Sequence, residues 1–394
     1  MIQNKGTILL AILFFSLGLT AYCQKEMTTK NIADFVVDKK ATPETLALFY
    51  NLKKLSKTNI ALGQQDAFNG FYFNIGGKSD IKKTTGFDPA VLGLDFAFIT
   101  DDKNTGKVDN WFFQQEQKTI ADVQKAYSLG IITTFCWHFK EPYKGEAFYA
   151  EKMTDLQMNS VRSILPNGEK NAYFNKKLDK IADFAKNLKG KKGEAIPFIF
   201  RPFHEFDGNW FWWGKPFCTA EEYKQLYAYT VNYLKEVKGV HNLLFAFSPD
   251  NQFNSNEDYL ERYPGDEFVD VLGMDDYGNF DNKGDQGSKK SNANLKIISD
   301  LAKEKNKIAA LTETGYQITF TKNPIDNFFS KYIYNALTAN DIEIAYVMFW
   351  TNNAEAYFVP QPNMPDTNDF IDFSKKPKLI LQNQLPNMYV LDKK

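Results

Sequence analysis

Cysteine and histidine are scarce in this sequence of 394 residues, which has three of each. It contains no Cys-x-x-Cys pair and no His-Glu-x-x-His motif. A disulfide framework and a zinc hydrolase site are therefore not expected, and we predict no metal and no cofactor. An excess of either charge is missing too, because the formal net charge is −1. This balance gives no indication of nucleic acid or an anionic membrane as a partner.

Long hydrophobic runs are also rare, and the only one lies at the N-terminus, at residues 8–22 after Lys5. Its length and flanking charge are typical of a secretion signal, predicted over 1–23, and it is too short to span a membrane comfortably. Cleavage after Cys23 would leave Gln24 as the new terminus of a secreted or periplasmic protein. The alternative is an outer-membrane lipoprotein anchored through Cys23. Tyr22 argues against it, because lipoprotein signals usually have a small residue at that position.

No low-complexity linker divides the rest of the chain, so we expect one domain over 24–394, with a core of about 40–385. An apolar run that ends in polar residues recurs eight times in it. Near-continuous apolar runs are typical of strands buried on both faces of a parallel sheet. The runs lie at 60–66, 91–98, 131–138, 196–205, 243–250, 268–277, 307–316 and 344–353.

Helical patterns lie between most of these runs, and Thr219 with Glu222 predicts a capping box at the start of one of them. Only loop is expected between the first two runs, and a weak helix near 369–384. Eight strands with intervening helices predict an α/β fold, the (β/α)8 or TIM barrel, with its site at the C-terminal ends of the strands. The predicted helices occupy 119–130, 174–190, 219–239, 292–306 and 323–340.

Several predicted strands end in groups that carry chemistry. Glu205 and Glu313, on the fourth and seventh runs, would face each other across the barrel mouth. Glycoside hydrolysis needs such a pair, one carboxyl to donate a proton and the other to attack, about 5–5.5 Å apart when configuration is retained. A structural alternative stays open, because Arg201 is near enough in sequence to pair with Glu205. The other strand-end candidates are His138, His204, Asp250, Asp275, Tyr277 and Trp350.

Several of the candidates have two interpretations. His204 is either a buried structural histidine or a donor to the substrate or to the other carboxylate. The Tyr277 hydroxyl could hold the attacking carboxylate, with Asp275 behind it, or both could make ordinary loop hydrogen bonds. Trp210 belongs to an aromatic cluster at 210–213, in which one or two side chains are expected to face sugar rings while the others anchor the loop.

The stretch "RPFHEFDGNWFWWG" (201–214), together with "LTETGY" (311–316), resembles glycoside hydrolase family 26, whose best-known members are β-1,4-mannanases. The resemblance covers about 40–385. Its most specific part is Arg-Pro-x-His-Glu, then Asn-Gly or Asp-Gly, then Trp-x-Trp-Trp. Asp207 precedes the glycine in this sequence, where asparagine is the alternative, and His204 stands directly before the glutamate, as in the family.

The resemblance implies a retaining double displacement on β-1,4-mannan, with Glu205 as acid/base and Glu313 as nucleophile. It also implies substrate contacts from His138, His204, Trp210 and Trp350, and places Tyr277 against the nucleophile, with Asp275 two residues before it. We expect a monomer that acts on mannan, galactomannan or glucomannan.

Alternatives remain within the family and outside it. Related specificities are β-1,3-xylanase and mixed-linkage β-glucanase, and a barrel that binds glycans without catalysis belongs to another class. Internal or end-wise cleavage would depend on the loops 66–90, 139–170 and 279–291, whose conformations the sequence does not reveal.

Overall fold

The computed structural model describes residues 26–68, 78–319, 324–354 and 356–391 of the chain. The predicted secretion signal, including Cys23, lies outside the described residues. Within the ranges that are described, no helix is both long enough and apolar enough to cross a bilayer.

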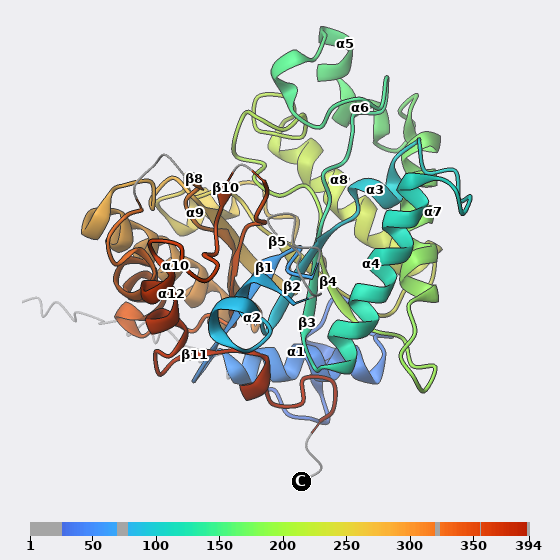
Figure 1. The fold of residues 1–394 in the computed structure, drawn as a ribbon. Helices are drawn as coiled ribbons and strands as arrows, with labels where there is room; N and C mark the ends of the chain where they lie inside the picture. The colour runs from blue at the N-terminus through green and yellow to red at the C-terminus, as the bar shows by residue number, and fades with distance from the viewer. Residues whose placement is uncertain (1–25, 69–77, 320–323, 355, 392–394) are drawn as a thin grey trace, which may run out of the picture.

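Eight parallel strands close into a barrel at the centre of the described chain (Figure 1). Each predicted run contributes one strand, and consecutive runs form neighbouring strands. Pairing of Leu62 on the first strand with Val347 on the last closes the ring, which confirms the predicted (β/α)8 barrel. The barrel strands are β1 Ile60–Gln65, β2 Val91–Asp95, β3 Ile132–Cys136, β4 Phe198–Arg201, β5 Leu243–Phe247, β6 Val271–Asp276, β7 Ile308–Thr314 and β9 Tyr346–Phe349.

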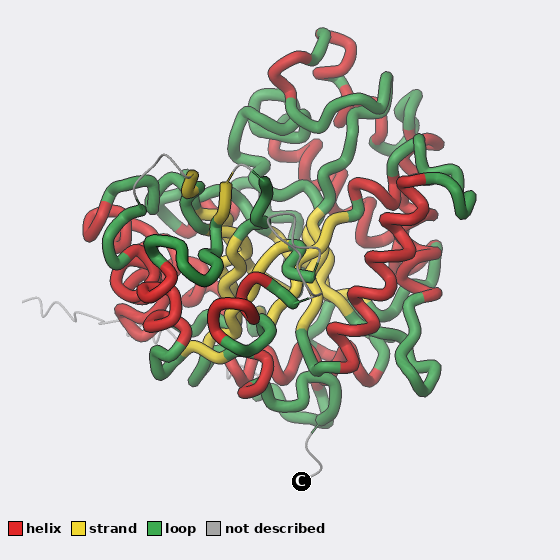
Figure 2. Tube along the Cα trace, viewed as in Figure 1, coloured by secondary structure: helices red, strands yellow, loops and turns green. Residues whose placement is uncertain are grey.

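Helices surround the strands in the predicted order (Figure 2). Thr219 and Glu222 form the predicted capping box at the start of α8. The interval expected to be loop contains a short helix, α2 Asp80–Thr85, which its caps define more than its periodicity: Ser79 accepts from Lys82 N, and Gly86 ends the helix at φ +89°. The predicted helices are α4 Trp111–Ser128, α7 Asn171–Asn187, α8 Ala220–Asn232, α10 Gly284–Glu304, α11 Tyr334–Thr338 and, for the weak last segment, α12 Thr367–Ser374.

Smaller elements complete the described chain. Tyr233–Val237 and Phe328–Ile333 are π-helical turns that adjoin α8 and α11. The remaining helices and strands are α1 Pro43–Leu55, α3 Ala97–Thr100, α5 Asp155–Met158, α6 Ser160–Ile164, α9 Asn256–Leu260, β8 Ile318–Thr319, β10 Ala356–Tyr357 and β11 Leu379–Ile380. Single 3₁₀ turns occupy Ile32–Asp34, Ala150–Lys152, Ala339–Asp341 and Gln382–Gln384.

The two ends of the barrel interior differ in chemistry. At the N-terminal ends of the strands, an apolar layer packs against α1, which lies across this end in Figure 1. Side chains alternate between the two faces of a strand, so every second residue after one in this apolar layer also points into the barrel. These residues form an inward-pointing row on each strand. On β2, β4 and β6 that row ends in a charged residue: Val91 leads to Asp95, Ile199 to Arg201 and Val271 to Asp275. The charges thus gather at the C-terminal end.

Candidate active site

A cleft of about 500 Å³ opens at the C-terminal ends of the barrel strands. Side chains that follow or end six of the strands meet in it. Eight of the nine candidates named from the sequence line the cleft, and Asp275 does not. The lining consists of His138, Tyr149, His204, Glu205, Trp210, Phe211, Asp250, Tyr277, Gly278, Glu313 and Trp350.

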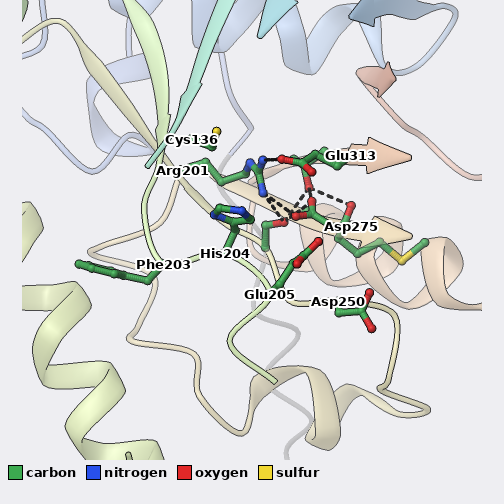
Figure 3. Close-up of polar contacts among 12 residues, drawn as sticks. Cys136, Arg201, Phe203, His204, Glu205, Asp250, Asp275 and Glu313 are labelled. Atoms are coloured by element: carbon green, nitrogen blue, oxygen red, sulfur yellow. Dashed lines mark hydrogen bonds and ion pairs between the residues drawn. The ribbon is translucent and has the colours of Figure 1, made fainter. Parts of the chain in front are cut away.

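Glu205 reaches the cleft from a tight turn directly after β4. Phe203 and Glu205 both have left-handed backbones, with φ values of +51° and +52°. Such values are uncommon for residues other than glycine and persist only where the surroundings fix them. The Glu205 amide donates to the Ser248 carbonyl at 2.8 Å, and the Tyr223 hydroxyl donates to the Phe203 carbonyl at 2.9 Å. In Figure 3, Glu205 consequently turns toward the polar cluster and Phe203 away from it.

The Glu205 carboxyl lies in surroundings that favour its protonated form. Burial, followed by the charges of Asp275, Glu313 and Asp250, raises its pKa well above the ordinary value. One contact opposes this: the Trp210 indole N–H donates to Glu205 Oε2 at 2.5 Å. Arg201, the alternative partner, forms its ion pairs elsewhere, with Asp275 and Glu313. Glu205 can therefore hold a proton at pH values where an exposed glutamate is ionised.

A register shift turns Glu313 into the barrel. Met274 on β6 is paired with Leu311 on β7, but the next residue, Asp275, is paired with Glu313, so Thr312 is an extra residue in β7. Regular alternation would place only one of two consecutive side chains inside. The bulge lets both point inward, as bulges near active sites often do. Thr312 accordingly bonds to Asp275, while Glu313 reaches the cleft.

Glu313 has two partners that stabilise its ionised form. An Arg201 guanidinium N–H donates to Oε1, and the Tyr277 hydroxyl donates to Oε2 at 3.0 Å. Burial still outweighs them and raises the pKa of Glu313 to about 7, with Asp275 adding to the rise. The two glutamates of the cleft therefore differ in charge environment, because only Glu313 has an arginine against it.

Asp275 is fully buried beneath the cleft and does not line it, so it lies behind the cleft residues. Its Oδ1 accepts from the Ser248 and Thr312 hydroxyls at 2.8 and 2.7 Å, and its Oδ2 accepts from Arg201 at 2.6 Å. Burial raises the pKa of Asp275, and Arg201 opposes that rise. Figure 3 shows the Arg201 side chain pointing toward both Asp275 and Glu313. Asp275 therefore orients Arg201, which in turn contacts Glu313.

The two histidines of the cleft face each other edge to face, with ring centroids 4.9 Å apart. His138 Nδ1 lies 2.6 Å from Asp95 Oδ2. His204 is 1% exposed, and its Nδ1 has no hydrogen-bond partner among the described residues. Burial, with Arg201 and His138 nearby, lowers the pKa of His204 well below its ordinary value. His204 is therefore a neutral side chain in this cleft.

The aromatic cluster at 210–213 divides into two residues that line the cleft, Trp210 and Phe211, and two that anchor the loop beneath it. Trp210 is half-buried and lines the cleft. Trp212 and Trp213 are fully buried, and their indole N–H groups donate to the carbonyls of Phe139 and His204 at 2.8 and 2.7 Å. Phe211 is buried under Tyr149, whose ring stacks on it at 5.4 Å. Trp210 is thus held in place by a packed base.

Three residues that matter here were not among the candidates named from the sequence. Arg201 and Asp95 end strands β4 and β2 as isolated charges after an apolar run, a signal that the sequence does contain. Tyr149 lies in the long connection after β3 and is about half exposed, at 53%. No pattern in that connection indicates which of its side chains reaches the cleft.

In the part of the chain that the structure describes, two groups of side chains hold possible metal-ligand atoms within 4.8 Å of one another: Asp95, Cys136 and His138, and His204, Asp275 and Glu313. In the first group, Asp95 and His138 are hydrogen-bonded to each other. In the second group, Arg201 forms ion pairs with both carboxylates. Side chains of the protein itself therefore balance the charges in both groups.

Comparison with known proteins places this cleft in a family. Residues 37–345 match the model of glycosyl hydrolase family 26. The mannan endo-1,4-beta-mannosidase of Bifidobacterium adolescentis is 36% identical over 88% of this chain and 37% of its own length. That of Bacillus subtilis is 25% identical over 70% of this chain and 74% of its own. The chain thus spans little more than a third of the first of these two relatives.

Comparison with solved structures indicates the same family. The GH26C structure from Muricauda sp. MAR_2010_75 superimposes with a TM-score of 0.92 at 53% identity, covering 94% of this chain and all of that one. The endo-beta-1,4-mannanase of Cellulomonas fimi gives a TM-score of 0.82 at 32% identity, over 90% and 79% of the two chains. Because the family model matches most of its length, this chain belongs to glycosyl hydrolase family 26.

Proposed function

We propose that this chain is a retaining endo-β-1,4-mannanase that cleaves mannan, galactomannan or glucomannan without a cofactor. The observation that carries the proposal is the pair Glu205 and Glu313, which line one cleft with different partners. Relatives across most of the chain are named mannan endo-1,4-beta-mannosidases, which supports mannan as the substrate.

The proposed reaction has two displacements. In the first, a Glu313 carboxylate oxygen bonds to the anomeric carbon, the glycosidic C–O bond breaks, and Glu205 gives its proton to the departing oxygen. In the second, Glu205 takes a proton from water, and the water oxygen displaces Glu313 from the anomeric carbon. Two inversions leave the product with the β configuration of the substrate.

The partners of each carboxyl support this assignment. Arg201 and Tyr277 hold both oxygens of Glu313, which orients the side chain and stabilises its ionised form. Glu205 has no arginine against it, and burial among other acids favours its proton. Environments that separate the pKa values of two carboxyls are how such sites assign acid and nucleophile.

The remaining cleft residues are proposed to hold the sugar next to the cleaved bond. Trp210 and Trp350 present half-buried indole surfaces that suit the C–H faces of a pyranose ring. His138 and His204 offer ring nitrogens to hydroxyl groups. Tyr277 lies close enough to Glu313 to contact the same sugar.

Internal cleavage is proposed because the cleft has room beyond one sugar. A second cavity of about 460 Å³ includes Tyr277 and Gly278, which also line the cleft, and continues along Gly315, Gln317 and Phe358. A polysaccharide bound inside its chain needs such a continuation on at least one side. Of the loops expected to decide this, part of 66–90 lies outside the described residues.

The decisive experiment is hydrolysis of a panel of pure mannans, xylans and β-glucans, with product lengths followed over time. Early mixed oligosaccharides from β-1,4-mannan support the proposal, and early mannose or mannobiose alone would show end-wise action. Turnover of xylan or glucan instead of mannan would assign a related specificity. Calorimetric binding of mannan without release of reducing ends would support a non-catalytic glycan-binding barrel.

We further propose that residues 24–394 are one exported catalytic domain that acts as a monomer. The secretion signal predicted at 1–23 and the barrel architecture support this. Mass spectrometry of the mature protein distinguishes a free Gln24 terminus from a lipidated Cys23, and light scattering measures the oligomeric state.

A further inference from the structure

A second pair of hydrogen bonds links the end of β2 to the residue after β3. His138 Nδ1 is 2.6 Å from Asp95 Oδ2, and the His138 backbone amide donates to Asp95 Oδ1 at 3.1 Å. One carboxylate thereby fixes both the main chain and the ring of His138. Asp95 in turn accepts from the Ala97 amide at 2.8 Å, so its own orientation is fixed. Such a pair leaves the imidazole little freedom to rotate.

The ring of His138 is bonded on one side only. Its hydrogen bonds among the described residues run through Nδ1, and the residue lines the cleft with about 9% of its surface exposed. With Nδ1 held by Asp95, Nε2 is the nitrogen left for a ligand. Phe148, Phe211 and Trp350 pack around the ring at centroid distances of 4.9, 5.5 and 5.8 Å. These uncharged neighbours limit the access of water to it.

The charges around His138 favour its cationic form. Burial by itself lowers the pKa of the imidazole, but Asp95 outweighs it, and Glu313 on β7 adds to the rise, so the pKa is raised. Arg201 on β4 opposes this rise. His138 in turn contributes to the lowered pKa of its neighbour His204. Asp66, directly after β1, is a further acid near His138. Burial raises the pKa of Asp66 to about 7, and the charge of His138 opposes that rise. On β3 itself, the buried Cys136 thiol lies 3.8 Å from Nδ1 and has a raised pKa, which keeps it uncharged.

We infer that Asp95 is a positioning residue, which holds His138 as a cation and presents its Nε2–H to a hydroxyl group of the bound sugar. The inference rests on the proposed function for the identity of the ligand. It divides the two cleft histidines by charge: His138 is a cationic donor, and His204 is neutral. A charged donor forms the stronger hydrogen bond, and here it faces the sugar that reacts.

The variant that tests this is Asp95→Asn, which keeps the size of the side chain and removes its charge. The asparagine carbonyl can still accept from the His138 amide, but its NH₂ group faces Nδ1, which must then accept a hydrogen bond and carry no proton of its own. The chain offers a matched control, because His241 Nδ1 lies 2.7 Å from Asp38 Oδ2, far from the cleft. Asp38→Asn breaks the same kind of contact without touching the site.

The measurement is a pH titration of the imidazole nitrogens by ¹⁵N NMR. The chain has three histidines, so a His138→Gln sample identifies the His138 signals. We expect His138 to be an imidazolium at neutral pH in the wild type and neutral in Asp95→Asn, while Asp38→Asn leaves the His138 titration unchanged. Identical His138 titrations in wild type and Asp95→Asn would overturn the inference. If Asp95→Asn does not fold, a neutral His138 in the wild type at pH 6 to 7 overturns it equally.

Kinetics then separate positioning from structure. On mannan, Asp95→Asn should lower kcat/KM by about 10-fold, the effect of exchanging a charged for a neutral hydrogen bond in a buried site. Asp38→Asn should leave kcat/KM unchanged. A changed titration without any change in kcat/KM would refute the sugar contact. Inactivity of the wild type on every mannan would instead reject the proposed function and leave the titration result standing.

Discussion

Glu205 and Glu313 are the same residue type in the same cleft, and the chain around them differs in almost every respect. Glu205 sits on a left-handed backbone after β4, and its carboxyl accepts a hydrogen bond from Trp210. Glu313 sits on β7 at a bulge, with Arg201 on one oxygen and Tyr277 on the other. The difference teaches that partners rather than residue type decide which carboxyl keeps its proton.

We expect the largest effect when Glu313, the proposed nucleophile, is replaced. Glu313→Ala should lower kcat on mannan by at least about 10⁴-fold, because it removes the carboxylate that is proposed to bond to the anomeric carbon. Azide should then restore turnover of an aryl mannoside with a good leaving group and give the α-mannosyl azide. Product configuration by NMR is the measurement. A β-configured azide product, or no rescue in a folded variant, would contradict the assignment of Glu313.

Removing the acid should produce an effect that depends on the leaving group. Glu205→Ala should lower kcat on mannan by about 10³-fold, within the range for general acid catalysis. With dinitrophenyl mannosides, whose leaving group needs no proton, formation of the covalent intermediate should be nearly normal and visible as a burst. Rates on both substrate types check this, and equal losses on the two would refute the role of Glu205 as acid.

The arginine that distinguishes the two glutamates is the next target. Arg201→Met leaves Asp275 and Glu313 buried without a counter-charge, so the free energy of unfolding should fall by about 3–5 kcal/mol. Denaturant unfolding measures the loss. Arg201→Lys, which keeps the charge but not the two-pronged contact, is the control and should lose less. Equal stability of the wild type and Arg201→Met would show that the ion pairs contribute nothing net.

The smallest expected effects come from two hydrogen bonds, one to each carboxyl. Activity should rise with pH as Glu313 ionises and fall as Glu205 loses its proton. Tyr277→Phe removes a donor to Glu313, whose pKa then rises, so the acidic limb of the kcat/KM profile moves to higher pH. Trp210→Phe removes a donor to Glu205, whose pKa also rises, so the alkaline limb moves to higher pH. Each variant should shift its own limb only, and losses of about 10-fold are expected. If Tyr277→Phe shifted the alkaline limb, or Trp210→Phe the acidic limb, the roles assigned to Glu205 and Glu313 would have to be exchanged.

The barrel and the strand-end residues were accessible to sequence reasoning because each depends on a local pattern. An apolar run followed by polar residues marks the strand and its C-terminal end together, which is why Glu205, Glu313 and Tyr277 were found in one step. Helices with clear periodicity were found for the same reason, whereas α2, defined by its caps over six residues, was not.

The features that could not be predicted from the sequence depend on contacts between segments that are far apart in the chain. The pairing of Arg201 with Asp275 and Glu313 spans three strands, and the bulge at Thr312 is a property of how β6 and β7 align. Asp275 ends a strand just as the cleft residues do, and only the barrel shows that its inward position places it below the cleft. In the aromatic cluster, four similar residues give no local sign of which one the fold leaves open.

Arg201 also bears on how the barrel assembles. Its guanidinium joins β4 to acids on β6 and β7, and the three side chains are almost completely shielded from water. A partly folded barrel that buries Arg201 before β7 has docked, or docks β7 one residue out of register, places charges in a poorly solvating interior with no partner. The charge network thus acts as a check on strand order and alignment during folding, and the same contacts that prepare the nucleophile penalise incomplete barrels.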